Sequence, residues 1–140
     1  MRECFHQGVA LYAMARKSKK RKYKTAADRI LREIIKWVES ENRNVGHYRC
    51  FLDAESAVLR KKFIEAENCY KESIVLAARP GYIHGAALFN ERYADFNQNS
   101  GHKLDGAADE AQYRLQEAIR CYKKSGALKA RYSNFWIRQQ

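Results

Sequence analysis

The chain has little of the residues that break regular structure, with one Pro and seven Gly among 140 residues. Disordered chains are usually rich in such residues, so this scarcity argues against disorder. No run approaches the roughly 20 apolar residues that a membrane-spanning helix needs, although 46% of the residues are apolar. We therefore expect a soluble protein whose 140 residues form one domain with a buried core.

Cysteine is also sparse, and its four positions are not grouped. Cys4, Cys50, Cys69 and Cys121 are far apart, without a Cys-x-x-Cys pair or a His at ligand spacing. Metal sites and disulfide frameworks need closer patterns, so we expect buried free thiols, no metal and no cofactor. Residues 1–8 are too mixed in polarity for a secretory signal, which predicts a cytoplasmic protein, or a nuclear one if the source is a eukaryote.

Acidic residues are too few to balance the basic ones, with 16 against 27, and the formal net charge is +11. Such a charge permits contact with nucleic acid, an acidic protein or an anionic membrane surface. Seven of the nine residues from Arg16 to Lys24 are basic. Because these charges repel one another and cannot be packed inside, we expect an exposed turn there.

Helical periodicity is clearest in residues 48–79. The first half places Tyr48, Phe51, Leu52, Glu55, Val58 and Leu59 at helical spacing, and the second half does the same with Phe63, Ala66, Cys69, Tyr70, Ser73, Ile74 and Ala77. The connection through residues 60–62 is so short that the two helices must be antiparallel. The order of bulky and small residues in the second helix matches a tetratricopeptide-like repeat, with Ser73 in a place that prefers Ala.

The same pattern on both sides predicts an all-α fold, a right-handed superhelix of antiparallel helical hairpins with about seven helices. We place the hairpins at about residues 3–41, 47–79 and 83–125, and a final helix at 128–138. Thr25 is expected to cap a helix that runs to about Ser40, with Asp28 in its first turn. The connector from 98 to 106 is expected to be an exposed loop.

Several short strings resemble the helical, tetratricopeptide-like segment of large multidomain signalling proteins that join serine/threonine-kinase-like, ATPase, GAF and histidine-kinase domains. The matching strings are Ala15-Arg16-Lys17, Lys20 to Tyr23, the helix with Trp37, Ala54-Glu55, Ala87-Leu88, Asn90-Glu91, Tyr93, Tyr122, Gly126-Ala127 and Lys129-Ala130. Ser125, where the family tends to carry Trp, and a longer connector at 97–106 depart from the pattern. The resemblance implies a regulatory or protein-interaction scaffold in signal transduction.

Catalytic candidates are weak. His6, His47, His84 and His102 lie near expected helix ends or loops, so we interpret them as surface or capping residues. Glu55 and Glu91 are expected to face inward, where a partnered polar group between helices is a simpler reading than general acid–base chemistry. The chain lacks a phosphate-binding glycine loop and kinase motifs. We therefore predict no enzyme activity.

A protein partner is the preferred prediction, because the first helix of each hairpin in such arrays usually lines the binding groove. The exposed residues expected to make this contact are Arg49, Asp53, Arg60, Asn90, Arg92 and Asp95. The alternative is a helical protein that binds nucleic-acid phosphates through the basic run, extended along the next helix. Its residues would be Arg16, Lys17, Lys19, Lys20, Arg21, Lys22, Lys24, Arg29 and Arg32, with Lys36 beyond them. In a eukaryote the run could also serve nuclear import.

Overall fold

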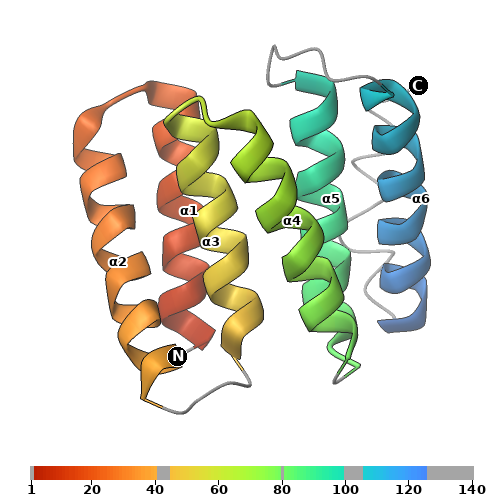
Figure 1. Ribbon diagram of the computed structural model, residues 1–140, viewed down its shortest axis with the longest axis horizontal. Coiled ribbons are helices and arrows are strands. Elements are labelled where there is room, and N and C mark those ends of the chain that lie inside the picture. The colour runs from red at the N-terminus through yellow and green to blue at the C-terminus, as the bar shows by residue number, and fades with distance from the viewer. Residues whose placement is uncertain (1, 41–44, 80, 100–105, 126–140) are drawn as a thin grey trace. The chain divides into compact units, whose positions relative to one another are not determined.

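A computed structural model describes residues 2–40, 45–79, 81–99 and 106–125, and every regular element in these ranges is an α-helix (Figure 1). The all-α prediction is confirmed for this part of the chain. The six helices are α1 (Arg2–Ser18), α2 (Arg21–Glu39), α3 (Gly46–Leu59), α4 (Phe63–Ala78), α5 (Ile83–Asn99) and α6 (Ala107–Ser125). The expected final helix at 128–138 and the expected loop at 98–106 lie wholly or largely outside the described residues.

The chain divides into two compact units, residues 1–73 and 74–140, and the boundary lies within α4. In the first unit, α1 packs against α2 and α3, and α2 also contacts α3. α1 and α2 run in opposite directions (Figure 1). The expectation of a single domain over 1–140 stays a prediction.

Aromatic side chains fill the core of the first unit. The Phe5 ring stacks on the Tyr48 ring with centroids 4.2 Å apart, and its edge meets Phe51 at 5.8 Å. Phe51 in turn meets Tyr70 of α4 at 5.9 Å in an edge-to-face arrangement. Such pairs add to the free energy gained from burial alone, by about 0.5–1.5 kcal/mol each. The rings therefore join α1, α3 and the first part of α4.

Gly8 lets α1 approach its neighbours closely. A Cβ atom at this position would lie 3.1 Å from a methyl carbon of Ile30 on α2 and 3.2 Å from one of Leu52 on α3. These distances are shorter than ordinary van der Waals contacts, so a larger residue would push the helices apart. The absence of a side chain thus sets the distance between α1 and both other helices.

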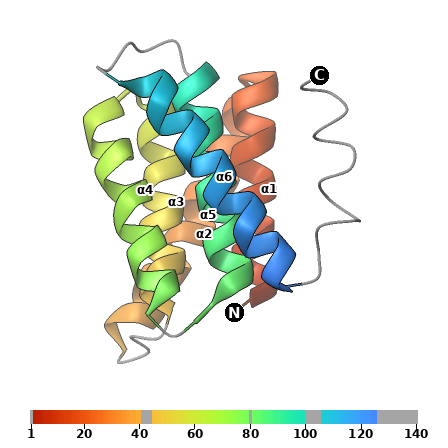
Figure 2. The same ribbon diagram turned by 90° about the vertical axis from the view of Figure 1, so that its right-hand side faces the viewer.

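The second unit is built mainly from α5 and α6, which lie side by side in opposite directions (Figures 1 and 2). α5 buries Phe89, Tyr93 and Phe96, and α6 turns Ala111 and Ala118 inward. The two alanines are seven residues apart and therefore lie on one face of the helix. Small residues on α6 leave room for the large rings of α5.

The turn expected over Arg16–Lys24 is mostly helical. α1 continues to Ser18, only Lys19 and Lys20 connect the helices, and α2 begins at Arg21, so Thr25 lies inside a helix and is not its cap. Lys and Arg are good helix formers whose long side chains reach water from a helical backbone. Lys19 makes the tight turn with a left-handed φ of 57°. Charge repulsion therefore kept the run exposed without unwinding it.

Candidate interaction surfaces

A buried carboxylate lies at the centre of the first unit. Glu55 of α3 is 0% exposed, and its Oε2 accepts hydrogen bonds from Arg16 Nη1 at 2.6 Å and from the Tyr70 hydroxyl at 3.0 Å. A buried charge is costly unless it is paired and hydrogen-bonded, and this one is both. The prediction that Glu55 is a partnered polar group between helices is confirmed. Arg16, expected in an anion-binding patch, is instead engaged with the core.

Tyr12 makes a second polar link inside the same unit. Its ring is fully buried on α1, and its hydroxyl donates to the Asp28 carboxylate of α2 at 2.7 Å. Burial, and then the hydrogen bond to Asp28, raise the pKa of Tyr12 well above its ordinary value. The hydroxyl therefore stays protonated and holds α2 against α1.

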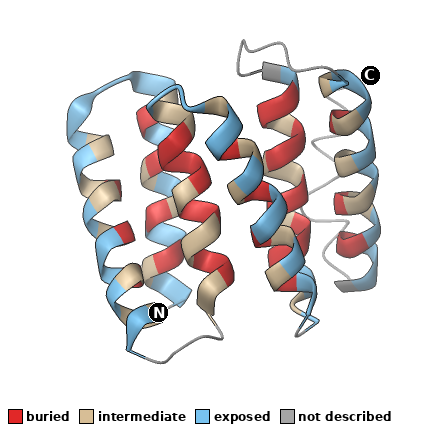
Figure 3. Ribbon diagram, viewed as in Figure 1, coloured by how far each residue is buried: buried red, intermediate tan, exposed pale blue. Residues whose placement is uncertain are grey.

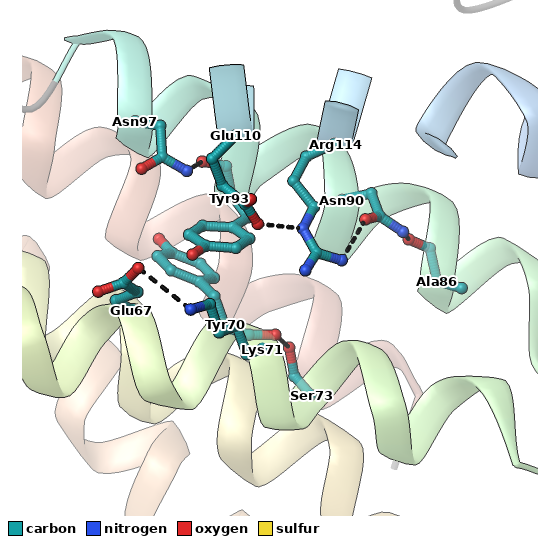
Figure 4. A network of polar contacts seen from close by, with 10 residues as sticks. All are labelled: Glu67, Tyr70, Lys71, Ser73, Ala86, Asn90, Tyr93, Asn97, Glu110 and Arg114. Carbon is teal, nitrogen blue, oxygen red and sulfur yellow. Dashed lines mark hydrogen bonds and ion pairs between the residues drawn. The ribbon is translucent and has the colours of Figure 1, made fainter. Parts of the chain in front are cut away.

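Polar contacts in the second unit centre on Arg114 of α6 (Figure 4). Its guanidinium donates to Glu110 at 2.8 Å and to the Asn90 side chain of α5 at 3.4 Å. The same group lies 5.2 Å from the Tyr93 ring and 5.1 Å from the Tyr113 ring. Arg114 thus uses charge, hydrogen bonds and aromatic contacts to hold the two helices together.

Glu91 is likewise engaged with its neighbouring helix. Its Oε2 accepts a hydrogen bond from the Tyr122 hydroxyl of α6 at 2.8 Å. The prediction of a partnered polar group is therefore confirmed for Glu91 as it is for Glu55. Glu55 and Glu91 thus each link their own helix to a neighbouring one.

Histidine and cysteine positions differ in part from the expectation. His47 is 5% exposed rather than on the surface, its ring lies 4.2 Å from the Tyr48 ring, and burial lowers its pKa. All four thiols are free as predicted, but only Cys121 is buried, while the other three are half-buried. Burial also raises the pKa of Cys50 to about 12 and that of Cys69 to about 11. Both are therefore poor nucleophiles.

Three of the residues predicted to bind protein lie along α3 of the first unit, Arg49 and Asp53 within the helix and Arg60 at its C-cap. Arg49 pairs with Asp53 at 3.7 Å, and Arg60 pairs with Glu65 of α4, also at 3.7 Å. Burial raises the pKa of Asp53, while the charges of Arg49 and Arg60 lower it and that of Glu65 raises it. Asp53 is thus influenced by the charges of both ion pairs, and we refer to the four residues as the mixed-charge cluster.

Of the residues on α5 predicted to bind protein, two form an ion pair and one is buried. Arg92 and Asp95 form an ion pair at 2.6 Å, in which Asp95 remains 48% exposed. Asn90 was wrongly expected at the surface, since it is 3% exposed and its amide donates to the Ala86 carbonyl at 2.9 Å. Periodicity placed Asn90 on α5 but could not reveal that Arg114 of α6 lies over its side chain.

An exposed apolar side chain precedes one member of the mixed-charge cluster in the chain. Ile64, in the first turn of α4, is 68% exposed and directly precedes Glu65 of the Arg60–Glu65 ion pair. We use the name α3–α4 patch for Arg49, Asp53, Arg60, Ile64 and Glu65. Ile64 was not among the residues predicted to bind protein.

The basic run forms a separate surface, which we name the cationic face. It consists of the exposed residues Lys17, Lys19, Lys20, Arg21, Lys22, Arg29 and Arg32. Figure 3 shows the exposed side of α2 opposite its buried residues. Lys24 is half-buried, and Lys36 pairs with Glu33 at 3.6 Å. The structure thus retains most of the predicted anion-binding residues at the surface and removes Arg16.

No protein-family model, no curated protein and no solved structure matches this chain. The resemblance to a segment of multidomain signalling proteins therefore stays a prediction. Within the described ranges, no group of three His, Cys, Asp or Glu side chains could hold a metal ion. No helix in those ranges is both long and apolar enough to cross a membrane.

Proposed function

We propose that this chain is a non-catalytic protein-binding module, a helical scaffold that holds its partner through the α3–α4 patch. The observation that carries this proposal is the 68% exposure of Ile64, which directly precedes Glu65 of an ion pair. Burying such a side chain against a partner contributes roughly 1.5–3 kcal/mol, the size of an interface hot spot. The surrounding charges of both signs would fix the orientation of a partner with matching charges.

The charged side chains of the patch can exchange their present ion pairs for ion pairs with another protein. Arg60 and Glu65 are 39% and 48% exposed, and surface pairs of this kind contribute only about 0–1 kcal/mol to folding. Either side chain can therefore turn from its present partner to an opposite charge on another protein at low cost. We propose further that the hairpins form a tetratricopeptide-like superhelix. We also propose that the module acts in signal transduction.

The proposal is tested by replacing Ile64 with a charged residue. A partner captured with the full chain would be purified and its binding measured by titration calorimetry. We expect Ile64→Asp to weaken binding by at least about tenfold, since it removes the apolar contact and places a charge in the interface.

The matched control is Val75→Asp, a second exposed β-branched residue on α4, 51% exposed. It should bind like the wild type, and circular dichroism should show both variants folded. If Ile64→Asp binds with wild-type affinity, the α3–α4 patch is not the binding surface.

A further inference from the structure

The seven cations of the cationic face have no counter-charge within the described part of the chain. None of them forms an ion pair with a carboxylate there, whereas Arg49, Arg60, Arg92, Arg114 and Arg120 all do. The carboxylates on the exposed side of α2, Glu33 and Glu39, stand towards its end, and Glu33 already pairs with Lys36. Asp28 of α2 is half-buried and accepts the Tyr12 hydrogen bond, so the exposed charged residues in the first half of this surface are all positive.

Several of these cations occupy positions where they disfavour the local fold. Lys20 is an N-cap without a side-chain hydrogen bond. The first turn of α2 contains no acidic residue, although a helix N-terminus carries partial positive charge. Positions that break local rules in this way often belong to functional surfaces. An anion bound here would relieve the repulsion.

Three kinds of anionic partner differ in what they require. A membrane surface favours a helix with an apolar face available to lipid, but Ala27, Leu31 and Ile34 of α2 are buried in the core. Protein interfaces are depleted in Lys, whereas four of the first five members of the cationic face are Lys. Phosphate groups of nucleic acid are commonly contacted by Lys as well as Arg.

We infer that the cationic face binds the phosphate backbone of duplex nucleic acid, without reading its sequence. From Lys22 to Arg32, α2 advances by about 15 Å, at about 1.5 Å per residue. Over that length a duplex presents about nine phosphate charges, one per about 1.7 Å of its axis. A duplex therefore carries charge dense enough to match the cationic face. This function is independent of the α3–α4 patch.

The experiment measures binding of the full chain to a labelled random-sequence duplex of about 20 base pairs by fluorescence anisotropy. With about six phosphate contacts, affinity should fall about a thousandfold between about 50 mM and about 200 mM salt. The variant Lys19→Gln/Lys20→Gln should bind more weakly at the lower salt concentration. Its plot of log affinity against log salt should be shallower by about two units, one for each lost contact.

The α3–α4 turn offers a matched control, because Lys61 has a φ of 59° and is followed by Lys62, and both are exposed. Lys61→Gln/Lys62→Gln removes the same charge from a turn of the same kind and should leave binding and its salt slope unchanged. An equal loss in both variants would mean that net charge alone attracts the duplex. No binding near 50 mM salt would also overturn the inference. So would tighter binding of polyglutamate or anionic lipid vesicles than of the duplex at equal charge concentration.

Discussion

At the scale of single residues, chemically similar side chains next to each other in the chain have different tasks. Arg16 and Lys17 are both basic, yet Arg16 reaches the buried Glu55 while Lys17 points to solvent. Helical geometry explains the difference, because neighbouring positions on a helix are about 100° apart. The basic run is therefore not one functional unit, and its first residue serves stability.

Replacing Arg16 by Met should destabilise the protein by about 3 kcal/mol, because it removes the cation that pairs with the buried Glu55 carboxylate. Urea unfolding followed by circular dichroism measures this loss. Lys17→Met is the control and should change the free energy of unfolding by less than about 0.5 kcal/mol. Equal effects of the two substitutions would contradict a stabilising role for the Arg16–Glu55 pair.

Tyr12 predicts a specific pH dependence of stability. Its folded pKa is raised above the ordinary value of 10.0, so the unfolded chain loses this proton at a lower pH than the folded protein does. The contribution of Tyr12 should therefore be complete below pH 10 and decline above it, by up to about 1.4 kcal/mol per pH unit. Unfolding measured against pH for the wild type and for Tyr12→Phe isolates this effect. A constant difference between the two proteins above pH 10 would refute it.

At the scale of elements, α2 combines a well-packed face with an unfavourable beginning. Its inner face buries Ala27, Leu31 and Ile34, and Asp28 accepts the hydrogen bond of Tyr12. Its first turn places cations against the positive end of the helix dipole. Tertiary packing therefore stabilises a helix whose N-terminus is poorly suited to start one.

This balance predicts that a better cap makes the protein more stable. Lys20 has extended backbone angles, φ −82° and ψ 128°, which suit an Asn cap. Lys20→Asn should be more stable than Lys20→Gln by about 1 kcal/mol, because both remove the charge but only Asn has the short side chain that caps a helix. Thermal unfolding would reveal the difference. If the cationic face binds a duplex, both variants should lose affinity equally.

At the scale of the whole molecule, the net charge is +11, and the basic side chains differ in whether a carboxylate neutralises them. Many Arg side chains are neutralised by nearby carboxylates, whereas the cationic face is not. Repulsion among close unpaired cations opposes the folded state and is screened by salt. Stability should therefore depend on ionic strength, and the dependence should originate mainly in the first unit.

We expect the free energy of unfolding to rise by roughly 1 kcal/mol when NaCl is raised from about 20 mM to about 200 mM. Lys19→Gln/Lys20→Gln should show a smaller rise, because two of the repelling charges are gone. Lys61→Gln/Lys62→Gln should behave like the wild type. Chemical denaturation with urea, which is uncharged, measures the effect, and a salt dependence unchanged in Lys19→Gln/Lys20→Gln would locate the repulsion elsewhere.

The sequence alone determined the helical class, most helix positions and the inward direction of Glu55 and Glu91, because apolar periodicity is a local property of the chain. Tertiary structure decided which charges are available. The Arg16–Glu55 contact spans 39 positions and the Glu55–Tyr70 contact spans 15, so neither follows from local spacing. Only the packing of α6 on α5 buried Asn90. The exposure of Ile64, in the first turn of α4, was also decided by tertiary structure. Apolar periodicity predicts the helix but does not show which neighbouring elements cover its ends.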